Sequence, residues 1–247
     1  MLAYSTVKRV ILQTGDPTER KVRFMALLTS ALPKRGARPV LVGGSAVEVY
    51  LDGVLRTGDM DVVHEPRALR PVLEAWRFDL GTGMRAWVND ELGLAVDMVG
   101  GELAGSTERT TTITTDYGPA TIIGVEDLVL KRLASAKHWK VPADMEQAYL
   151  LAKAFEEKLD WAYVEAEAGR GLVADYLQTL KRMLADTRSS GSSSRFVVRG
   201  TSKRASEPRR SKHWTGLKQT DSKSNGRATS RLPRSPGQSQ PSRFREG

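Results

Sequence analysis

Two patterns of apolar residues divide the first 186 residues of the chain. From residue 38 to residue 123, short apolar runs alternate with turns, which predicts short strands with a few helices between them. From residue 125 to residue 186, apolar residues recur at helical spacing almost throughout, which predicts four consecutive helices. We therefore expect an α+β fold, in which a small mixed β-sheet is flanked by helices and is followed by a helical C-terminal half.

Turn and capping residues place the ends of these elements. Pro33 and Gly36 follow the first amphipathic helix and end it, and Pro66 stands in the first turn of a later helix. The predicted helices are 20–32, 45–53, 66–78, 125–140, 142–158, 160–168 and 171–185, and the predicted strands are 39–44, 59–63, 84–90, 92–100 and a pair within 110–124.

The net charge of +9 is concentrated at the C-terminal end. From Thr187 to Gly247 the chain holds 15 Lys or Arg residues against 3 Asp or Glu residues, a net charge of +12, which leaves −3 for residues 1–186. This segment also holds 14 Ser and few large apolar residues, so it cannot bury enough surface to offset the entropy of ordering. We predict a disordered basic Ser/Arg-rich tail over 187–247. Such an arm would bind nucleic acid weakly through phosphate groups, and the alternative is an incidental extension.

The absence of cysteine excludes a disulfide scaffold, a thiolate metal site and a cysteine nucleophile. The sequence has no run of 18 apolar residues, and its first residues lack the cleavage pattern of a secretory signal. We therefore expect a cytoplasmic protein without a membrane partner.

Acidic residues in two predicted strands are the strongest chemical feature. Asp59 and Asp61 are two apart, so both side chains face one side of a strand. Hard divalent cations such as Mg²⁺ prefer oxygen ligands of this kind, and the alternative is a solvated strand edge. Asp97 interrupts the otherwise apolar strand LGLAVDMVG, where a buried carboxylate is costly unless a cation compensates it.

A glycine pair precedes these acids at a predicted strand-to-helix turn. Gly43 and Gly44 would let the backbone approach a ligand closely, and the N–H groups of the helix that starts near Ser45 favour a phosphate. The alternative is a tight corner without a ligand.

The order of these features resembles the nucleotidyltransferase superfamily related to DNA polymerase β. The residues LVGGSAVEVYLDGVLRTGDMDVV (41–63) match its glycine pair at a helix start and its Asp-x-Asp pair, which a third acid on a neighbouring strand follows. They are most similar to small prokaryotic members, a group that includes abortive-infection toxins. The resemblance covers 38–100 and extends more loosely toward residue 150. Two features depart from the family pattern: Arg56 lies directly beside Thr57, and Gln147 stands where a second Asp is often found.

The resemblance implies a nucleotidyltransferase core over residues 1–124 and a helical region packed on it over residues 125–186. It implies that Asp59, Asp61 and Asp97 bind two Mg²⁺ ions, for which Mn²⁺ can substitute. Asp97 would hold the ion that activates the acceptor hydroxyl and would take the hydroxyl proton.

The resemblance also assigns the nucleotide contacts. Gly43, Gly44 and Ser45 would hold the nucleotide, and Lys131 would contact its triphosphate. Asp144 would order the helical half or contact the substrate, and we favour the structural role.

The expected activity is Mg²⁺-dependent transfer of a nucleoside monophosphate from a triphosphate such as ATP to an acceptor hydroxyl. The acceptor would be RNA such as a tRNA end, a protein side chain or a small molecule, and one biological form is the toxin of a toxin–antitoxin or phage-defence pair. Two alternatives stay open. One is a non-catalytic nucleotide- or nucleic-acid-binding module on the same fold, and the other is a kinase-like or nucleotide-sensing pocket.

Overall fold

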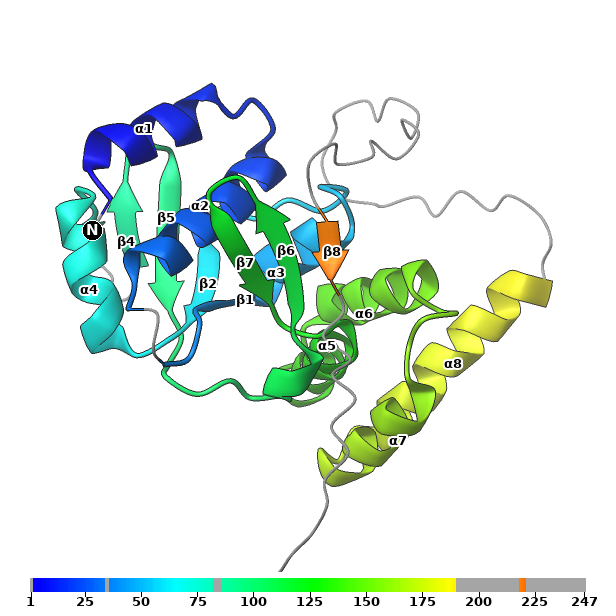
Figure 1. The fold of residues 1–247 in the computed structure, drawn as a ribbon. Coiled ribbons are helices and arrows are strands. Elements are labelled where there is room, and N and C mark those ends of the chain that lie inside the picture. Colours follow the sequence, from blue (N-terminus) through cyan, green and yellow to red (C-terminus); the bar gives the residue numbers. More distant parts are fainter. Residues whose placement is uncertain (1, 34–35, 82–85, 190–217, 221–247) are drawn as a thin grey trace, which may run out of the picture.

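The structure is a computed structural model that describes residues 2–33, 36–81, 86–189 and 218–220 (Figure 1). The helices are α1 (Tyr4–Gln13), α2 (Pro17–Ala31), α3 (Gly43–Tyr50), α4 (Pro66–Ala75), α5 (Val125–His138), α6 (Pro142–Ala154), α7 (Trp161–Arg170) and α8 (Ala174–Ser189). The strands are β1 (Val40–Val42), β2 (Met60–Val63), β3 (Asp79–Leu80), β4 (Ala86–Asn89), β5 (Leu94–Met98), β6 (Thr111–Thr115), β7 (Gly118–Ile122) and β8 (Lys218–Thr220).

The described strands form one mixed sheet in the order β3-β4-β5-β2-β1-β7-β6-β8. The pairs β2–β5 and β1–β7 are parallel, and the other pairs are antiparallel. The predicted α+β class and the mixed sheet are therefore confirmed. At the centre of this sheet, β5-β2-β1, Asp97 lies in β5 and Asp61 in β2, while Asp59 directly precedes β2 and the glycine pair directly follows β1.

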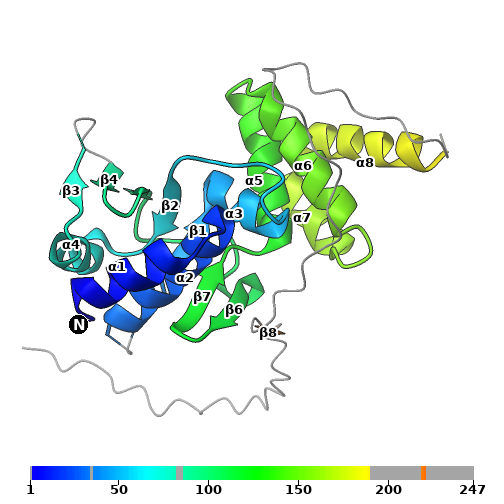
Figure 2. The same ribbon diagram turned by 90° about the horizontal axis from the view of Figure 1, so that it is seen from above.

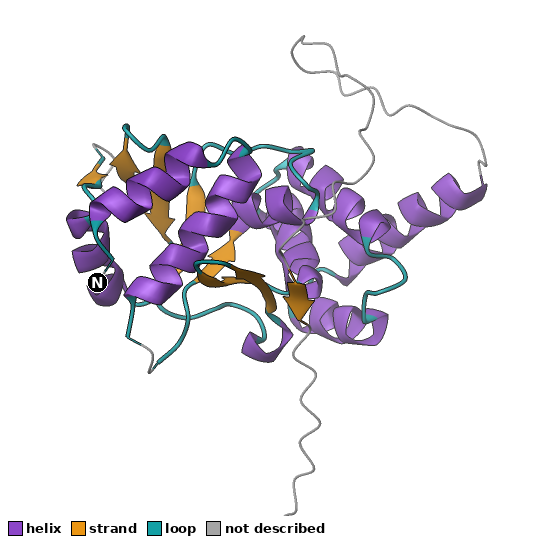
Figure 3. Cartoon of the chain, turned by 45° about the horizontal axis from the view of Figure 1, so that its top comes forward, coloured by secondary structure: helices purple, strands orange, loops and turns teal. Residues whose placement is uncertain are grey.

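The helices form two groups around the sheet. Helix α2 packs on β7 and contacts α1 and α3, and Figure 2 shows α1 and α2 running side by side. Helices α5 to α8 pack on one another, and α5 and α6 also contact α3. In Figure 3 most strands gather in one part of the molecule, and the four C-terminal helices, which Figure 1 labels, lie in the other part, with β8 between the two. Helix α3 thus joins the sheet to the helical part.

An aromatic cluster fixes α2 against the sheet region. The ring of Phe24 lies 5.8 Å from that of Trp76 and 5.5 Å from that of Phe78, and all three side chains are buried. Burial of such rings dominates core energetics. The helix begins at Pro17, earlier than predicted, because the Asp16 side chain caps it by accepting from the N–H groups of its first turn.

Several elements differ from the sequence prediction. Helix α1 was not predicted, although Val7, Val10 and Ile11 have helical spacing and are buried. Helix α8 extends through Ser189 into the predicted tail, and β8 pairs with β6 at the edge of the sheet. The other residues of the predicted disordered tail lie outside the described part of the chain.

No helix in the described residues is both long and apolar enough to span a membrane.

A polar clamp ties the helical part to the connection between β5 and β6. Asp127 on α5 is buried and accepts from the Ser106 backbone N–H at 2.8 Å and from the Tyr163 hydroxyl at 2.7 Å. Burial and the hydrogen bond to Asp127 raise the pKa of Tyr163. The guanidinium of Arg109 lies 3.8 Å from the centre of the Tyr163 ring and pairs with Asp160 at 2.7 Å. The connection after β5 is therefore fixed to α5 and α7.

We expect Tyr163→Phe to lower the free energy of unfolding by about 2 kcal/mol, because it removes a hydrogen bond to a buried carboxylate. The measurement is urea unfolding of the full chain. Tyr176→Phe on α8 is the matched control, since no hydrogen bond of the Tyr176 hydroxyl is found within the described residues, and it should change stability by less than about 0.5 kcal/mol. Equal effects of the two variants would contradict the clamp.

Candidate functional site

Three acidic residues lie together on neighbouring strands at the centre of the sheet. Asp61 in β2 and Asp97 in β5 are direct partners in the parallel pairing of these strands. Asp59 immediately precedes β2 and is two residues from Asp61, a spacing that places both side chains on one side of a strand. Asp59 is exposed, whereas Asp61 and Asp97 are half-buried. The structure therefore brings together the three acidic residues that the sequence predicted as a group.

Asp61 is the electrostatic centre of this group. Burial and the charges of Asp59 and Asp97 raise its pKa above the ordinary value for an aspartate. The backbone N–H of Gly44, which donates to Asp61, and the charge of Arg132 oppose this rise without cancelling it. The negative charge around Asp61 is therefore not balanced by its surroundings, and a bound cation would relieve the excess.

The glycine at the end of β1 is required by the closeness of Asp61. Val42 lies opposite Asp61 in the β1–β2 pairing, so the backbone that leaves β1 passes beside the carboxylate. Gly43 has a φ of 64°, and a Cβ at this position would lie 1.7 Å from Oδ2 of Asp61. A Cβ at Gly44 would lie 2.6 Å from Cγ2 of Thr57. The glycine pair therefore makes room for two side chains of the site.

We expect Gly43→Ala to lower the free energy of unfolding by about 3 kcal/mol or more, because it adds a clash with Asp61 to an unfavourable φ. Gly93→Ala is the matched control: Gly93 has a φ of 62°, and a Cβ added there would meet no atom within 4 Å, so only the backbone penalty of about 1 kcal/mol applies. Thermal or urea unfolding measures both variants. A loss at Gly43 no larger than that at Gly93 would contradict the close approach.

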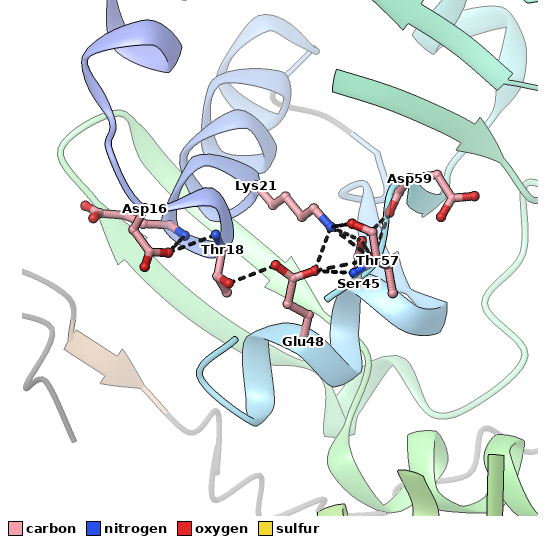
Figure 4. A network of polar contacts seen from close by, with 8 residues as sticks. Asp16, Thr18, Lys21, Ser45, Glu48, Thr57 and Asp59 are labelled. Atoms are coloured by element: carbon pink, nitrogen blue, oxygen red, sulfur yellow. Dashed lines mark hydrogen bonds and ion pairs between the residues drawn. The ribbon is translucent and has the colours of Figure 1, made fainter. Parts of the chain in front are cut away.

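Ser45 faces inwards, into the polar network drawn in Figure 4. Its side chain is completely buried, and its hydroxyl donates to the backbone carbonyl of Asp59 and lies 2.9 Å from the Thr57 hydroxyl. Lys21 on α2 donates to the same Ser45 oxygen at 3.1 Å. The Ser45 hydroxyl therefore holds the segment that carries Asp59.

Glu48, one turn further along α3, completes this network. Its buried carboxylate accepts from Lys21 Nζ at 2.7 Å, from the Thr18 hydroxyl at 2.8 Å and from the Thr57 backbone N–H at 3.0 Å. Burial alone would raise the pKa of Glu48, but these hydrogen bonds outweigh it and the pKa is lowered. Glu48 is therefore ionised at neutral pH and attracts all three donors.

Some polar groups of the glycine turn that were predicted to bind a nucleotide form hydrogen bonds within the protein. Gly43, Gly44 and Ser45 do lie at the start of α3 beside the acids. The Gly44 N–H donates to Asp61, and the Ser45 hydroxyl points into the network. Contact of this turn with a nucleotide stays a prediction.

Arg132, which directly follows Lys131 on α5, is a cation of the helical part whose charge lowers the pKa of Asp61. Contact of Lys131 with a triphosphate stays a prediction. Lys131 is exposed on α5 and has no hydrogen bond or ion pair with a described residue. Arg132 is half-buried, pairs with Asp144 at 3.0 Å and has a buried Nε without a hydrogen-bond partner in the described chain. Asp144 is buried and, through its pair with Arg132, links α6 to α5, which agrees with the structural role; contact with a substrate is not tested. Sequence reasoning missed Arg132 because adjacent helix positions look equivalent until the helix is packed.

The donor chemistry of the acids fits a divalent cation. Asp59, Asp61 and Asp97 offer the hard carboxylate oxygens that Mg²⁺ and Mn²⁺ prefer. Among the residues that the structure describes, no group of three or more acidic or histidine side chains is placed so that it could hold a metal ion as it stands. Like charges repel, so a cation is the agent that would draw these side chains together. Asp59 and Asp61 would hold it, with Asp97 beside them.

We expect Asp61→Asn to raise the melting temperature at neutral pH in metal-free buffer. The folded-state pKa of Asp61 lies above its unfolded value, so the ionised group opposes folding once the pH exceeds the unfolded pKa of about 3.9. The gain should therefore vanish in acid, and each kcal/mol corresponds to about 2–4 °C. Calorimetry at several pH values, with Asp90→Asn as an exposed control, measures it. A lower melting temperature for Asp61→Asn at neutral pH would show instead that the carboxylate stabilises the fold.

Comparisons of the chain with protein-family models, with curated proteins and with solved structures found no match.

Proposed function

We propose that the chain is a Mg²⁺-dependent nucleotidyltransferase, which moves a nucleoside monophosphate from a nucleoside triphosphate to an acceptor hydroxyl. The observation that carries the proposal is the direct pairing of Asp61 with Asp97 across β2 and β5, with Asp59 two residues away. The glycine turn that approaches Asp61 and the resemblance of residues 41–63 to that superfamily support the same reaction.

In the proposed reaction, the acceptor oxygen bonds to the α-phosphorus while the bond between that phosphorus and the bridging oxygen of the β-phosphate breaks. Pyrophosphate leaves with the electron pair of the broken bond. Bound Mg²⁺ supplies positive charge at the attacking and leaving oxygens. Asp59, Asp61 and Asp97 would hold the ions, and Asp97 would also accept the proton of the acceptor hydroxyl.

Arg132 supplies the positive charge that the phosphate groups need from the protein. Its charge already acts on Asp61, its side chain is partly exposed, and the hydrogen bond from its Nη1 to Asp144 at 3.0 Å fixes its position. A guanidinium held in this way can bind a phosphate oxygen without first losing side-chain freedom. Lys131, which is exposed on the same helix, is the second candidate.

The acceptor belongs to one of three classes: RNA such as a tRNA end, a protein hydroxyl or a small molecule. A toxin of a toxin–antitoxin or defence system is one biological role that fits the proposed reaction. The proposal places the enzyme in the cytoplasm, where its nucleotide substrate is made, and the cysteine-free sequence is compatible with a reducing compartment.

The test is incubation of the full chain with each α-³²P-labelled nucleoside triphosphate, Mg²⁺ and total cellular RNA and protein. We expect a labelled RNA or protein band, and we expect Asp59→Asn and Asp61→Asn each to lower labelling by at least about 10³-fold, since each loses a metal ligand. Asp90→Asn removes an exposed acid from the β4–β5 turn and should leave labelling unchanged.

Transfer of label from a γ-³²P-labelled nucleoside triphosphate, with a nucleoside diphosphate as the other product, would indicate a kinase-like pocket. If no label is transferred with any nucleotide, yet the chain binds Mn²⁺ and nucleotide in a manner that Asp61→Asn abolishes, the chain is a non-catalytic binding module. If it binds neither, the acids are structural and the proposal is wrong.

A further inference from the structure

Lys21, which is far from the acids in sequence, contacts the segment that leads to Asp59. Lys21 on α2 is only 5 % exposed, although a lysine ammonium is costly to bury unless it is paired. It donates to Glu48 at 2.7 Å, to the Thr57 carbonyl at 2.8 Å, to the Thr57 hydroxyl at 2.9 Å and to the Ser45 hydroxyl at 3.1 Å (Figure 4). An ammonium has three protons, so these acceptors use its full donor capacity. Lys21 therefore has no donor to spare for a phosphate ligand.

The contacts of Lys21 converge on the connection between α3 and β2, which ends at Asp59. This connection has no regular secondary structure, and it leaves α3 through Asp52 and Gly53, which both have positive φ. Val54 is 73 % exposed, whereas Leu51 and Leu55 are half-buried and pack against the core. The residues from Arg56 to Asp59 have no large apolar side chain, so apolar packing does not fix the position of Asp59 directly.

Hydrogen bonds to the backbone of residues 57–59 hold Asp59 in position. The Thr57 carbonyl accepts from Lys21, the Thr57 N–H donates to Glu48, and the Asp59 carbonyl accepts from Ser45. All three partners are buried, and Lys21 donates to the other two. Removal of Lys21 would leave Glu48 and Ser45 without their common donor.

A buried ion pair is by itself weak evidence for stability, because well-packed apolar residues can replace it without loss. Apolar residues would still join α2 to α3, but they would not hold the Thr57 carbonyl. The specific consequence of this pair is therefore the placement of the segment 57–59.

We propose that Lys21, with Glu48, is a positioning residue that holds Asp59 where it shares a divalent cation with Asp61. The proposal rests on the proposed function, because it assigns Lys21 a task in the same metal site. Lys21 itself touches neither the metal nor the substrate.

The test compares Lys21→Met with the full unaltered chain, using Mn²⁺ alone as the probe. Loss of the lysine charge leaves the region one unit more negative, so an electrostatic role predicts tighter Mn²⁺ binding. A positioning role predicts the opposite, weaker binding by about 10- to 100-fold, the range seen when groups that orient metal ligands are removed. Electron paramagnetic resonance of free Mn²⁺ gives the dissociation constant.

Two further variants separate positioning from stability. Lys21→Met/Glu48→Gln removes the unpaired carboxylate and restores charge balance, and we expect its Mn²⁺ binding to stay weak because the Thr57 carbonyl is still released. Phe24→Leu lowers stability on the same helix but touches none of the network, so its Mn²⁺ affinity should match that of the unaltered chain.

Hydrogen exchange of the backbone amides from Val54 to Asp61 provides a readout that needs no metal. Exchange there should become faster in both Lys21 variants and stay unchanged in Phe24→Leu. Unchanged exchange, or Mn²⁺ binding as tight as in the unaltered chain, overturns the role of Lys21 while the proposed function stands. If the unaltered chain itself binds no Mn²⁺, the proposed function fails and the assignment of Lys21 fails with it.

Discussion

The candidate site depends on the close approach of the backbone at Gly43 to the carboxylate of Asp61. Because β1 and β2 are antiparallel neighbours with Val42 opposite Asp61, the chain leaving β1 must turn directly beside that side chain. Only a residue without a Cβ fits there, and Gly43, with its positive φ, is both that residue and the first residue of α3. The start of α3 then places the Gly44 N–H against Asp61. One steric constraint thus sets the direction of α3 and the environment of the central acid.

Lys21, which is buried, and Arg132, which is half-buried, come from different parts of the chain and differ in their relation to the acids. Lys21 is saturated by oxygens of the protein, so it acts on the backbone that carries Asp59. Among the described residues Arg132 donates one hydrogen bond, to Asp144, out of its five N–H groups, and its charge reaches Asp61. The first cation is suited to holding the site and the second to binding a ligand. The helical part therefore contributes more than packing, because α5 and α6 supply Arg132 and the Asp144 that fixes it.

Much of the fold follows from local sequence patterns. The alternation of short apolar runs with turns predicted the central strands, and helical spacing predicted α2 and α5 to α8. Helix α1 carries the same signal in Val7, Val10 and Ile11 and was recoverable from it. The strands β3 and β8 were not, because two or three residues carry no periodicity and exist only through the partner strand that hydrogen-bonds them.

The sequence by itself determined which acids belong together, since Asp59 and Asp61 share a strand face and Asp97 breaks an apolar run. It also determined that glycines were needed at positions 43 and 44. Only the tertiary structure decided that Asp97 pairs with Asp61, that Ser45 faces inwards, and that Lys21 and Arg132 are the cations of the site. The reason is physical: strand register, helix rotation and the partners of a buried charge are set by contacts between segments far apart in the chain, and no local pattern records them.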